Sequence, residues 1–253
     1  MSISKPFHRT YRPFSNNRDA YYIFDREYAV DPGMYTRSFI MLQKELLELF
    51  DYVEPADTNL KTYSLKIYSL FVRVCIEVEA NFRAILSENH FTLESPRNWT
   101  KRQYRIINKS HHLSSYKVTF PIWSGKKSEF VPFNQWKNTS GDLEWYAVYN
   151  ECKHNRYGSM PKANFEALLN AFSALFIILS AQFGTEAYAP GSCMFAVSNP
   201  EGYYPDKFGI GDYLLIDFPD DWTDDELYDF DWRALSESPS RFQKYNYDEH
   251  KRF

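Results

Sequence analysis

The feature that most constrains the fold is a periodic stretch of about thirty residues, from Asn59 to Asn89. Its apolar residues recur at three- and four-residue steps, the spacing of one face of an α-helix. The members of this stripe are Ile67, Leu70, Phe71, Val74, Cys75, Val78, Phe82, Ile85 and Leu86. The stretch therefore predicts a long helix with one buried face.

Three further helices are predicted from similar patterns. Residues 33–53 and 142–156 carry amphipathic or capped helical segments, and residues 162–183 are apolar nearly all round. The last of these helices is expected to be the most buried. Together the four helices predict a mainly α fold, a four-helix bundle over residues 33–184.

The other segments lack a helical period. Residues 1–32, which are basic and aromatic, predict an N-terminal arm. Residues 91–138 predict an insertion with two short strands around a turn at Gly125, a β-hairpin. Residues 185–253 predict a mixed, acidic C-terminal extension packed on the bundle. Its strand-like pieces are "CMFAV" and "DYLLIDF", and its polar end from Ser236 is expected to be mobile.

Composition narrows the class of protein. The chain is 44% hydrophobic and 19% aromatic, typical of a folded globular protein. Its three cysteines form no C-x-x-C pair and no early apolar segment resembles a secretion signal, so we expect a cytoplasmic protein. The longest apolar run, Ala167 to Phe183, is shorter than the roughly 20 residues of a membrane span. It predicts a buried helix and no membrane partner.

Charge is unevenly distributed along the sequence. Residues 211–231 carry nine acids and no base, whereas residues 95–128 carry eight bases and no acid. The basic segment contains the residues expected to bind RNA, with rings among them to stack bases. These residues are Arg97, Lys101, Arg102, Arg105, Lys109 and Tyr104. Equally, the rings could close a small core while the acidic segment docks on the basic one and competes with nucleic acid.

A crowded polar motif, "YNECKHNRY" at residues 149–157, lies on the third predicted helix. Asn150 and His154 are four residues apart and share a face, with Lys153 and Arg156 beside them. An imidazole beside an amide and cations suits proton transfer near a phosphate. The same residues also suit the end of a surface helix, where cations complement the helix dipole. No His or Cys spacing predicts a metal site, and no phosphate-loop or nucleophile-elbow motif is present.

This motif resembles that of HEPN domains, four-helix bundles of bacterial and archaeal defence, toxin and CRISPR-associated proteins. Their third helix carries an Arg, a polar residue that is often Asn, three variable residues and a His. In "YNECKH", Asn150 and His154 are in register and Tyr149 occupies the Arg position. Stretches such as "CIEVEANFRAIL", "SHHLSSYKV" and "WYAVYNECKHNR", between Val53 and Phe183, resemble a group of bacterial proteins with a Y-N-x-x-K-H-x-R motif.

The resemblance implies an RNA-directed protein of a defence or stress-response system, a ribonuclease that needs no metal or other cofactor and acts as a homodimer. His154 would be the general acid or base, and Asn150 would orient it or contact phosphate. The Arg would be replaced by Lys153, Arg156 or Arg73, the last of these also an RNA contact. Glu79 would hold His154 protonated, or instead pair with Arg83.

The alternative is a non-catalytic HEPN-like module for dimerisation or for binding a partner protein such as an antitoxin. The two hypotheses differ in geometry. Catalysis is favoured if Asn150 and His154 line one groove with two or more cations from another helix or subunit. The interaction module is favoured if they pack against the chain's own Glu or backbone.

Overall fold

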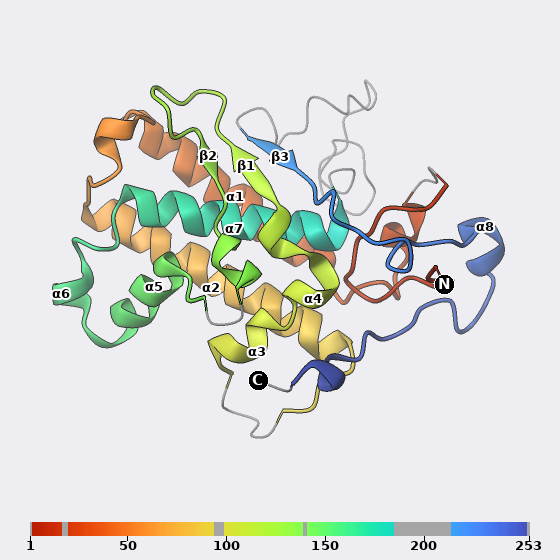
Figure 1. Ribbon diagram of the computed structural model, residues 1–253. Coiled ribbons are helices and arrows are strands. Elements are labelled where there is room, and N and C mark those ends of the chain that lie inside the picture. Colours follow the sequence, from red (N-terminus) through yellow and green to blue (C-terminus); the bar gives the residue numbers. More distant parts are fainter. Residues whose placement is uncertain (1, 17–19, 94–98, 139–140, 185–213, 252–253) are drawn as a thin grey trace.

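Two long helices form the centre of the molecule in the computed structural model, which describes residues 2–16, 20–93, 99–138, 141–184 and 214–251. They are α2 (Leu65–Glu88) and α7 (Phe165–Phe183), which pack along each other (Figure 1). Each begins at a polar cap: the side chain of Ser64 accepts a hydrogen bond from the Ile67 amide, and that of Asn164 accepts one from the Ala167 amide. These caps fix where both helices start.

Helices α1 (Pro32–Phe50) and α5 (Glu144–His154) each pack on both members of the central pair. The four helices predicted from the sequence are therefore present, and the fold is mainly α. Helix α5 ends at His154, two residues before the predicted end, because Asn155 leaves the helical region with φ −141° and ψ 75°. The Asn155 side chain then accepts a hydrogen bond from the Gly158 amide and begins α6 (Arg156–Ser159).

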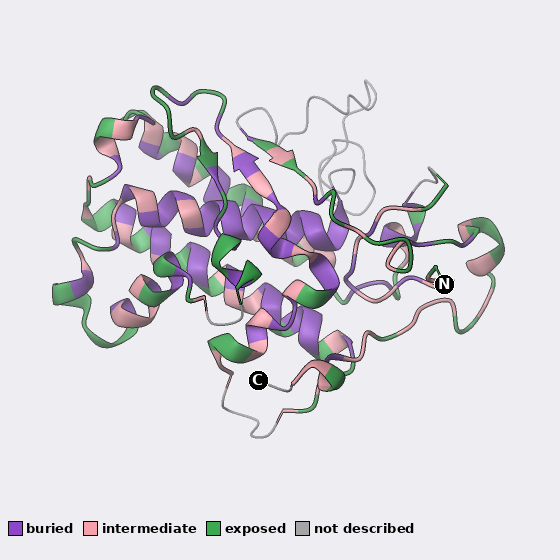
Figure 2. Cartoon of the chain, viewed as in Figure 1, coloured by how far each residue is buried: buried purple, intermediate pink, exposed green. Residues whose placement is uncertain are grey.

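Helix α7 is the buried core helix that its composition predicts. Every residue in it except Glu166 and Asn170 is buried (Figure 2). By length and composition alone it is the one described helix that could cross a membrane, but 89% of its most apolar stretch lies inside the molecule. Its apolar surface is thus covered by the other helices and by the insertion.

The insertion between α2 and α5 combines short helices with the predicted hairpin. Its elements are α3 (Lys101–Arg105), α4 (Asn108–His111), η3 (Leu113–Ser115), β1 (Lys117–Thr119), β2 (Glu129–Phe130) and η4 (Asn134–Lys137). The hairpin turn contains Gly125 at φ +136°. Asp57 fixes the turn by accepting hydrogen bonds from the Trp123 indole and from the amides of Lys126 and Lys127. A side chain at Gly125 would collide with this carboxyl group.

The C-terminal extension adds a third strand to this hairpin. Strand β3 (Leu215–Asp217) pairs antiparallel with β1, and the sheet order is β2-β1-β3. Val118 lies opposite Phe130 on one side and opposite Ile216 on the other. The predicted piece "DYLLIDF" therefore supplies the third strand, whereas "CMFAV" lies outside the described residues.

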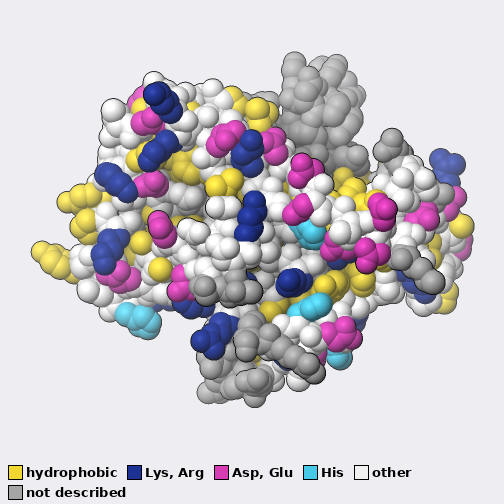
Figure 3. Space-filling view, in the orientation of Figure 1, with side chains coloured by type: hydrophobic (Ala, Val, Ile, Leu, Met, Phe, Trp, Pro, Cys, Tyr) yellow, Lys and Arg dark blue, Asp and Glu magenta, His cyan; other side chains and the backbone are white. Residues whose placement is uncertain are grey.

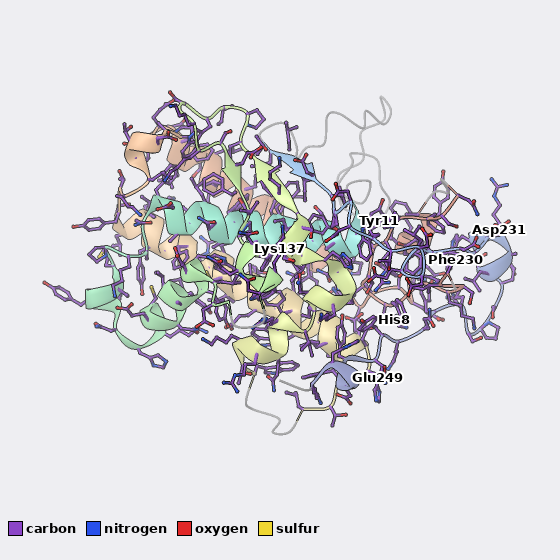
Figure 4. All side chains as sticks on the ribbon, viewed as in Figure 1. His8, Tyr11, Lys137, Phe230, Asp231 and Glu249 are labelled. Carbon is purple, nitrogen blue, oxygen red and sulfur yellow. The ribbon has the colours of Figure 1, made fainter. Side chains whose placement is uncertain are left out.

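The N-terminal arm and the end of the chain pack together beside the bundle. The short elements of this region are η1 (Tyr21–Phe24) in the arm, and α8 (Trp232–Leu235) and η6 (Tyr247–His250) near the C-terminus. A further short element, η2 (Asp57–Asn59), precedes α2 next to the hairpin turn. Ile3 and Phe14 form bridges with Tyr228. His8 and Tyr11 of the arm lie between the bundle and the C-terminal residues Phe230 and Asp231 (Figure 4).

The expectation of a mobile tail after Ser236 is wrong. Tyr247 is fully buried, and its hydroxyl lies 2.6 Å from the Ser110 hydroxyl in α4. The His111 ring beside Ser110 donates from Nε2 to the Arg9 carbonyl, 2.8 Å away. We call Arg9, Arg12, Ser110, His111 and Tyr247 the junction, because these buried residues join the arm, the insertion and the tail. The tyrosines of the tail supply the apolar surface that packs here, although the composition of the tail is mainly polar.

Candidate nucleic-acid groove

A groove of about 1280 Å³ runs between α3, α4, the start of α5 and the acidic segment 220–226. Apolar residues such as Phe82, Trp136 and Leu143 contribute to its walls. The cations that line it are Lys101, Arg102, Arg105, Lys109 and Lys137. Figure 3 shows Lys and Arg side chains across the middle of this face, with Asp and Glu side chains nearby.

The sequence of α3 and α4 directs these cations outward. Thr100 and Gln103 form a reciprocal capping box that starts α3. Tyr104 and the two following apolar residues, Ile106 and Ile107, are buried against the bundle. Lys101, Arg102 and Lys109, on either side of these buried positions, therefore face solvent along the groove, and Arg105 is partly exposed there.

Most of these cations are free to bind an anion. Arg102, Lys109 and Lys137 are exposed and have no carboxylate partner among the residues that the structure describes. Lys101 is paired with Asp142 at 2.6 Å, and Arg105 donates to the Asn138 carbonyl. Figure 4 labels Lys137 at the centre of this face. The predicted Arg97 lies outside the described residues.

Tyr104 does not present the stacking surface expected of it. Its ring is only 1% exposed and lies between Phe82, 5.0 Å away, and Trp99, 6.1 Å away. Its hydroxyl accepts a hydrogen bond from Arg83 Nε at 3.0 Å. Burial raises the pKa of Tyr104 to about 12, so the hydroxyl stays neutral. Tyr104 closes the core under the groove, which is the alternative role that the sequence left open.

The acidic segment docks on the insertion, but on residues 112–117 and away from α3. Asp221 accepts hydrogen bonds from the Ser115 hydroxyl at 2.6 Å and from His112 Nδ1 at 2.9 Å. Glu226 accepts from the other ring nitrogen of His112 at 3.0 Å. Burial raises the pKa of Asp221, but these hydrogen bonds outweigh it and lower the pKa below the ordinary value. This docking lies within the predicted residues 95–128, and no described hydrogen bond or ion pair joins the segment to Arg102 or Lys109.

The polar motif on α5 is divided between two environments. Asn150 lines the groove, whereas His154 is exposed at the last residue of the helix and does not line it. Lys153 lies over the Tyr149 ring, 3.9 Å from its centroid, and its Nζ is 3.4 Å from the Asn150 side-chain oxygen. A cation therefore stands beside the tyrosine, and it belongs to the motif itself.

The other two substitute cations lie elsewhere. Arg73 is paired at 2.6 Å with Glu45 of α1, so it supplies neither a charge near Tyr149 nor an RNA contact in the groove. A carboxylate on the neighbouring helix therefore binds Arg73 outside the groove, and its contact with RNA stays a prediction. The Arg156 guanidinium lies 5.7 Å from the centre of the Tyr68 ring, where α6 begins.

Glu79 of α2 contacts several side chains of α5 and α2 next to the motif. It accepts hydrogen bonds from Tyr146 at 2.6 Å and Lys153 at 2.8 Å, and it pairs with Arg83 at 3.2 Å. The Arg83 pair was one of the two predicted alternatives, while no contact to His154 is present. Burial and the neighbouring Glu79 both raise the pKa of Tyr146, so Tyr146 acts only as a neutral donor.

Comparisons with known proteins do not assign the chain to a family. No family model, curated protein or solved structure matches the chain. Among the described residues, no three His, Cys, Asp or Glu side chains lie close enough together to hold a metal ion. The site must therefore be interpreted from its own chemistry.

Three groove residues were missed by sequence reasoning. Lys137 follows the hairpin, and Asp220 and His112 come from segments far apart in the chain. Lys137 stands alone among polar and aromatic residues in "FNQWKNTS", so no local pattern distinguishes it. The excess of acids over residues 211–231 was the one signal that could have pointed to Asp220.

Proposed function

We propose that this chain is a HEPN-like, RNA-directed protein of a bacterial defence or stress-response system, and that it binds single-stranded RNA in the groove. The observation that carries the proposal is the run of exposed cations on one wall, of which Arg102, Lys109 and Lys137 have no described carboxylate partner. The packing of α1 and α5 on the central pair α2 and α7, together with the Asn150/His154 spacing, supports the HEPN-like assignment. A cytoplasmic location fits an RNA partner.

The charges explain why the partner should be a polyanion. Exposed cations that are not neutralised by carboxylates gain most from phosphates, because binding releases the counterions of the nucleic acid. The apolar walls at Trp136 and Leu143 would contact sugars and bases beside the phosphates. A duplex is disfavoured, because the groove also includes the acidic segment, and a flexible single strand avoids it more easily than a rigid helix does.

The test is RNA binding by a charge-reversed groove. Arg102→Glu should weaken binding of a labelled single-stranded RNA about ten-fold at low salt, measured by fluorescence anisotropy. The slope of log affinity against log salt should fall by about 1 for the lost phosphate contact. Arg37→Glu is the matched control, since Arg37 is exposed on α1 outside the groove. Equal losses in both variants, or no binding by the wild type, would refute the proposal.

Cleavage is a separate part of the same proposal. RNA leaving the groove at Asn150 along the motif would next meet Lys153 and then His154, a cation that could hold a phosphate and an imidazole that could move a proton, with Arg156 beyond them. Wild type and His154→Ala should be incubated with mixed RNAs in EDTA. Cleavage by the wild type alone supports a metal-independent ribonuclease. Equal cleavage by both proteins, or cleavage by neither, excludes this activity.

A non-catalytic interaction module is the second candidate. Lys153 is held by the chain's own Glu79, and Tyr157, the last residue of the motif, is 96% exposed. An exposed ring beside a motif helix suits contact with a second copy of the chain or with a partner protein such as an antitoxin. Tyr157→Ser should then convert a homodimer into a monomer in light scattering. A wild type that is already monomeric excludes the homodimer.

A further inference from the structure

His112 joins the acidic segment 220–226 to the insertion. Its Nδ1 lies 2.9 Å from an Asp221 carboxylate oxygen, and its Nε2 lies 3.0 Å from one of Glu226. The Trp222 ring stacks on the imidazole, with ring centroids 4.0 Å apart and planes inclined at 24°. The histidine side chain is only 15% exposed. Three residues of the segment are thus anchored around one ring.

The two carboxylate contacts need a doubly protonated ring. Burial raises the pKa of Asp221 and of Glu226, but their hydrogen bonds outweigh it and lower both pKa values, so both groups are ionised near neutral pH. Ionised carboxylates only accept hydrogen bonds, and a neutral imidazole has a single N–H to donate. Without its second proton, His112 would turn a lone pair toward one of the two carboxylates.

The segment lies between two ends that other contacts fix. Before it, β3 pairs with β1, and after it Tyr228 is fully buried, with its hydroxyl donating to the Thr10 carbonyl at 2.9 Å. Between these ends, the described side-chain hydrogen bonds to the insertion are those of His112 and of Ser115, which donates to Asp221 alone. The docking of the segment therefore depends mainly on the charge of one histidine.

We propose that His112 is a pH-dependent latch, whose imidazolium holds the acidic segment 220–226 on the insertion and whose loss of a proton releases it. A proton that only the docked state binds strongly favours docking at low pH, and this advantage is lost as the pH rises. An ordinary imidazole loses its proton at about pH 6.5. The latch is therefore closed at about pH 6 and opens toward about pH 8.5.

Most ionisable groups around the ring keep one charge state in this range. They are Lys109 and His111 of α4, Arg12 of the arm, Asp220 of the segment, and Tyr245 and His250 of the tail. Lysine and arginine stay charged, and carboxyl groups have already lost their proton. Burial lowers the pKa of His111 to about 3 and raises that of Tyr245, so both stay neutral. His250, whose Nε2 lies 3.1 Å from the Tyr245 hydroxyl, is the group to control for.

Release of the segment would also change the groove, and this step rests on the proposed function. Asp220, Asp221 and Glu226 line the groove together with its cations. Moving these carboxylates away removes like charge that repels RNA phosphates. RNA affinity should therefore rise with pH, although the lysines and arginines of the groove keep their charge.

Hydrogen exchange of residues 219–227, corrected for the intrinsic rate, tests the latch without RNA. Protection in the wild type should fall about ten-fold between about pH 6 and about pH 8.5, the size expected for one charge-assisted hydrogen bond. His112→Arg keeps a charge and donors for both carboxylates, so its protection should not change with pH. His112→Gln is neutral and should be poorly protected at both values. Both variants place an unbranched side chain at the same backbone position, φ +50°, so their strain is matched.

His250→Gln is the control, because His250 also lines the groove but contacts Tyr245. It should keep the response of the wild type. The latch is refuted if wild-type protection is equal at both pH values, if His112→Arg responds like the wild type, or if His250→Gln loses the response.

RNA affinity separates the latch from the proposed function. At constant salt the wild type should bind single-stranded RNA about two- to three-fold more tightly at the higher pH, and His112→Arg should show no such gain. If exchange responds to pH but the wild type binds no RNA, the proposed function fails and the latch stands. If RNA binds and exchange does not respond, the latch fails. Equal changes of affinity in both proteins would refute the effect of the latch on the groove.

Discussion

His111 and His154 stand in opposite surroundings within one chain. His111 is fully buried in the junction, with its Nε2 donating to the Arg9 carbonyl and its Nδ1 2.7 Å from the Ser110 hydroxyl. His154 is exposed at the end of α5, next to Lys153, and no described residue bonds to its ring. One histidine is satisfied by the fold, and the other is left to solvent or to a ligand.

The difference extends to the cations around each histidine. Arg9 is fully buried, pairs with Glu88 at 2.6 Å and also donates to Gln182. In the groove, Arg102 and Lys109 are exposed and have no such partners among the described residues. Buried and paired charge is what a fold uses to fix its own segments, and exposed unpaired charge is what remains for binding. Substitutions at buried, paired charges should therefore lower stability, and substitutions at exposed, unpaired charges should lower binding.

The largest effect is expected at Arg9. Arg9→Ala removes a buried guanidinium and with it the charged partner of Glu88 and the donor to Gln182, so the free energy of unfolding should fall by about 3 kcal/mol. Chemical denaturation measures it. Lys162→Ala, which breaks an exposed pair with Glu151, should change stability by less than about 1 kcal/mol. Similar losses of stability in the two variants would contradict the distinction between buried and exposed charge.

The junction should also make stability depend on pH. Burial lowers the pKa of His111 to about 3, from an ordinary value near 6.5. Between these values the unfolded chain binds a proton that the folded chain does not, so stability falls as pH falls. The slope from this group is at most about 1.4 kcal/mol per pH unit.

Unfolding measured between pH 7 and about 5.5 isolates this slope from the carboxylates, which titrate lower. His111→Gln should flatten it, because the variant has no group to protonate in the unfolded chain. His154→Gln should leave it unchanged, since His154 is exposed in the folded protein. The idea fails if both variants have the slope of the wild type.

The bundle could be predicted from the sequence because helical periodicity records which face of a segment is buried. The stripe on α2 and the apolar run of α7 have this property, and both helices contain the apolar residues that predicted them. Helix α2 begins only at Leu65, six residues after the predicted start, because Ser64 caps it there. Periodicity does not show which distant segment covers the buried face. Ser110 and Tyr247 are 137 residues apart, and neither has a local pattern that points to the other. The tail was therefore misjudged from its polar composition.

The candidate site was predictable to the same extent. Lys101, Arg102 and Arg105 of α3 are one, three and four residues apart, so the helical period places them on one side of this short helix. The partners of individual charges do not. Arg73 has Glu77 at the helical spacing of four but binds Glu45 across the helix interface. A sequence gives the candidates for an ion pair, and packing between helices selects among them.

A smaller effect is expected where the acidic segment docks. The lowered pKa of Asp221 means that its contribution to docking is present above the ordinary carboxyl pKa and is lost as pH falls below about 4. Hydrogen exchange of residues 214–230, corrected for the intrinsic rate, should accelerate in this range. Asp221→Asn should show the faster exchange already at neutral pH. Unchanged protection in the variant would show that the other contacts, such as strand β3 and the bridges of Tyr228 to the arm, hold the segment without Asp221.

The smallest change in stability is expected behind the motif. Glu79→Gln weakens contacts to Lys153 and Arg83, whose side chains are 36% and 48% exposed, so it should lower the free energy of unfolding by less than about 1 kcal/mol. The same change leaves Lys153 without its carboxylate, and the Lys153 ammonium lies beside Asn150 at the edge of the groove. RNA affinity should therefore rise two- to three-fold, by roughly the gain of one partly screened charge.

Glu151→Gln is the matched control for this effect. It likewise frees a lysine, Lys162, but neither residue lines the groove. Anisotropy with the same RNA should show no gain in affinity for Glu151→Gln. If the two variants gain equally, the added affinity reflects net charge alone, and Lys153 has no place in binding. If only Glu79→Gln gains, the chain's own carboxylate restrains the cation that stands beside Tyr149, and exposed charge near the motif is kept partly paired until a ligand competes for it.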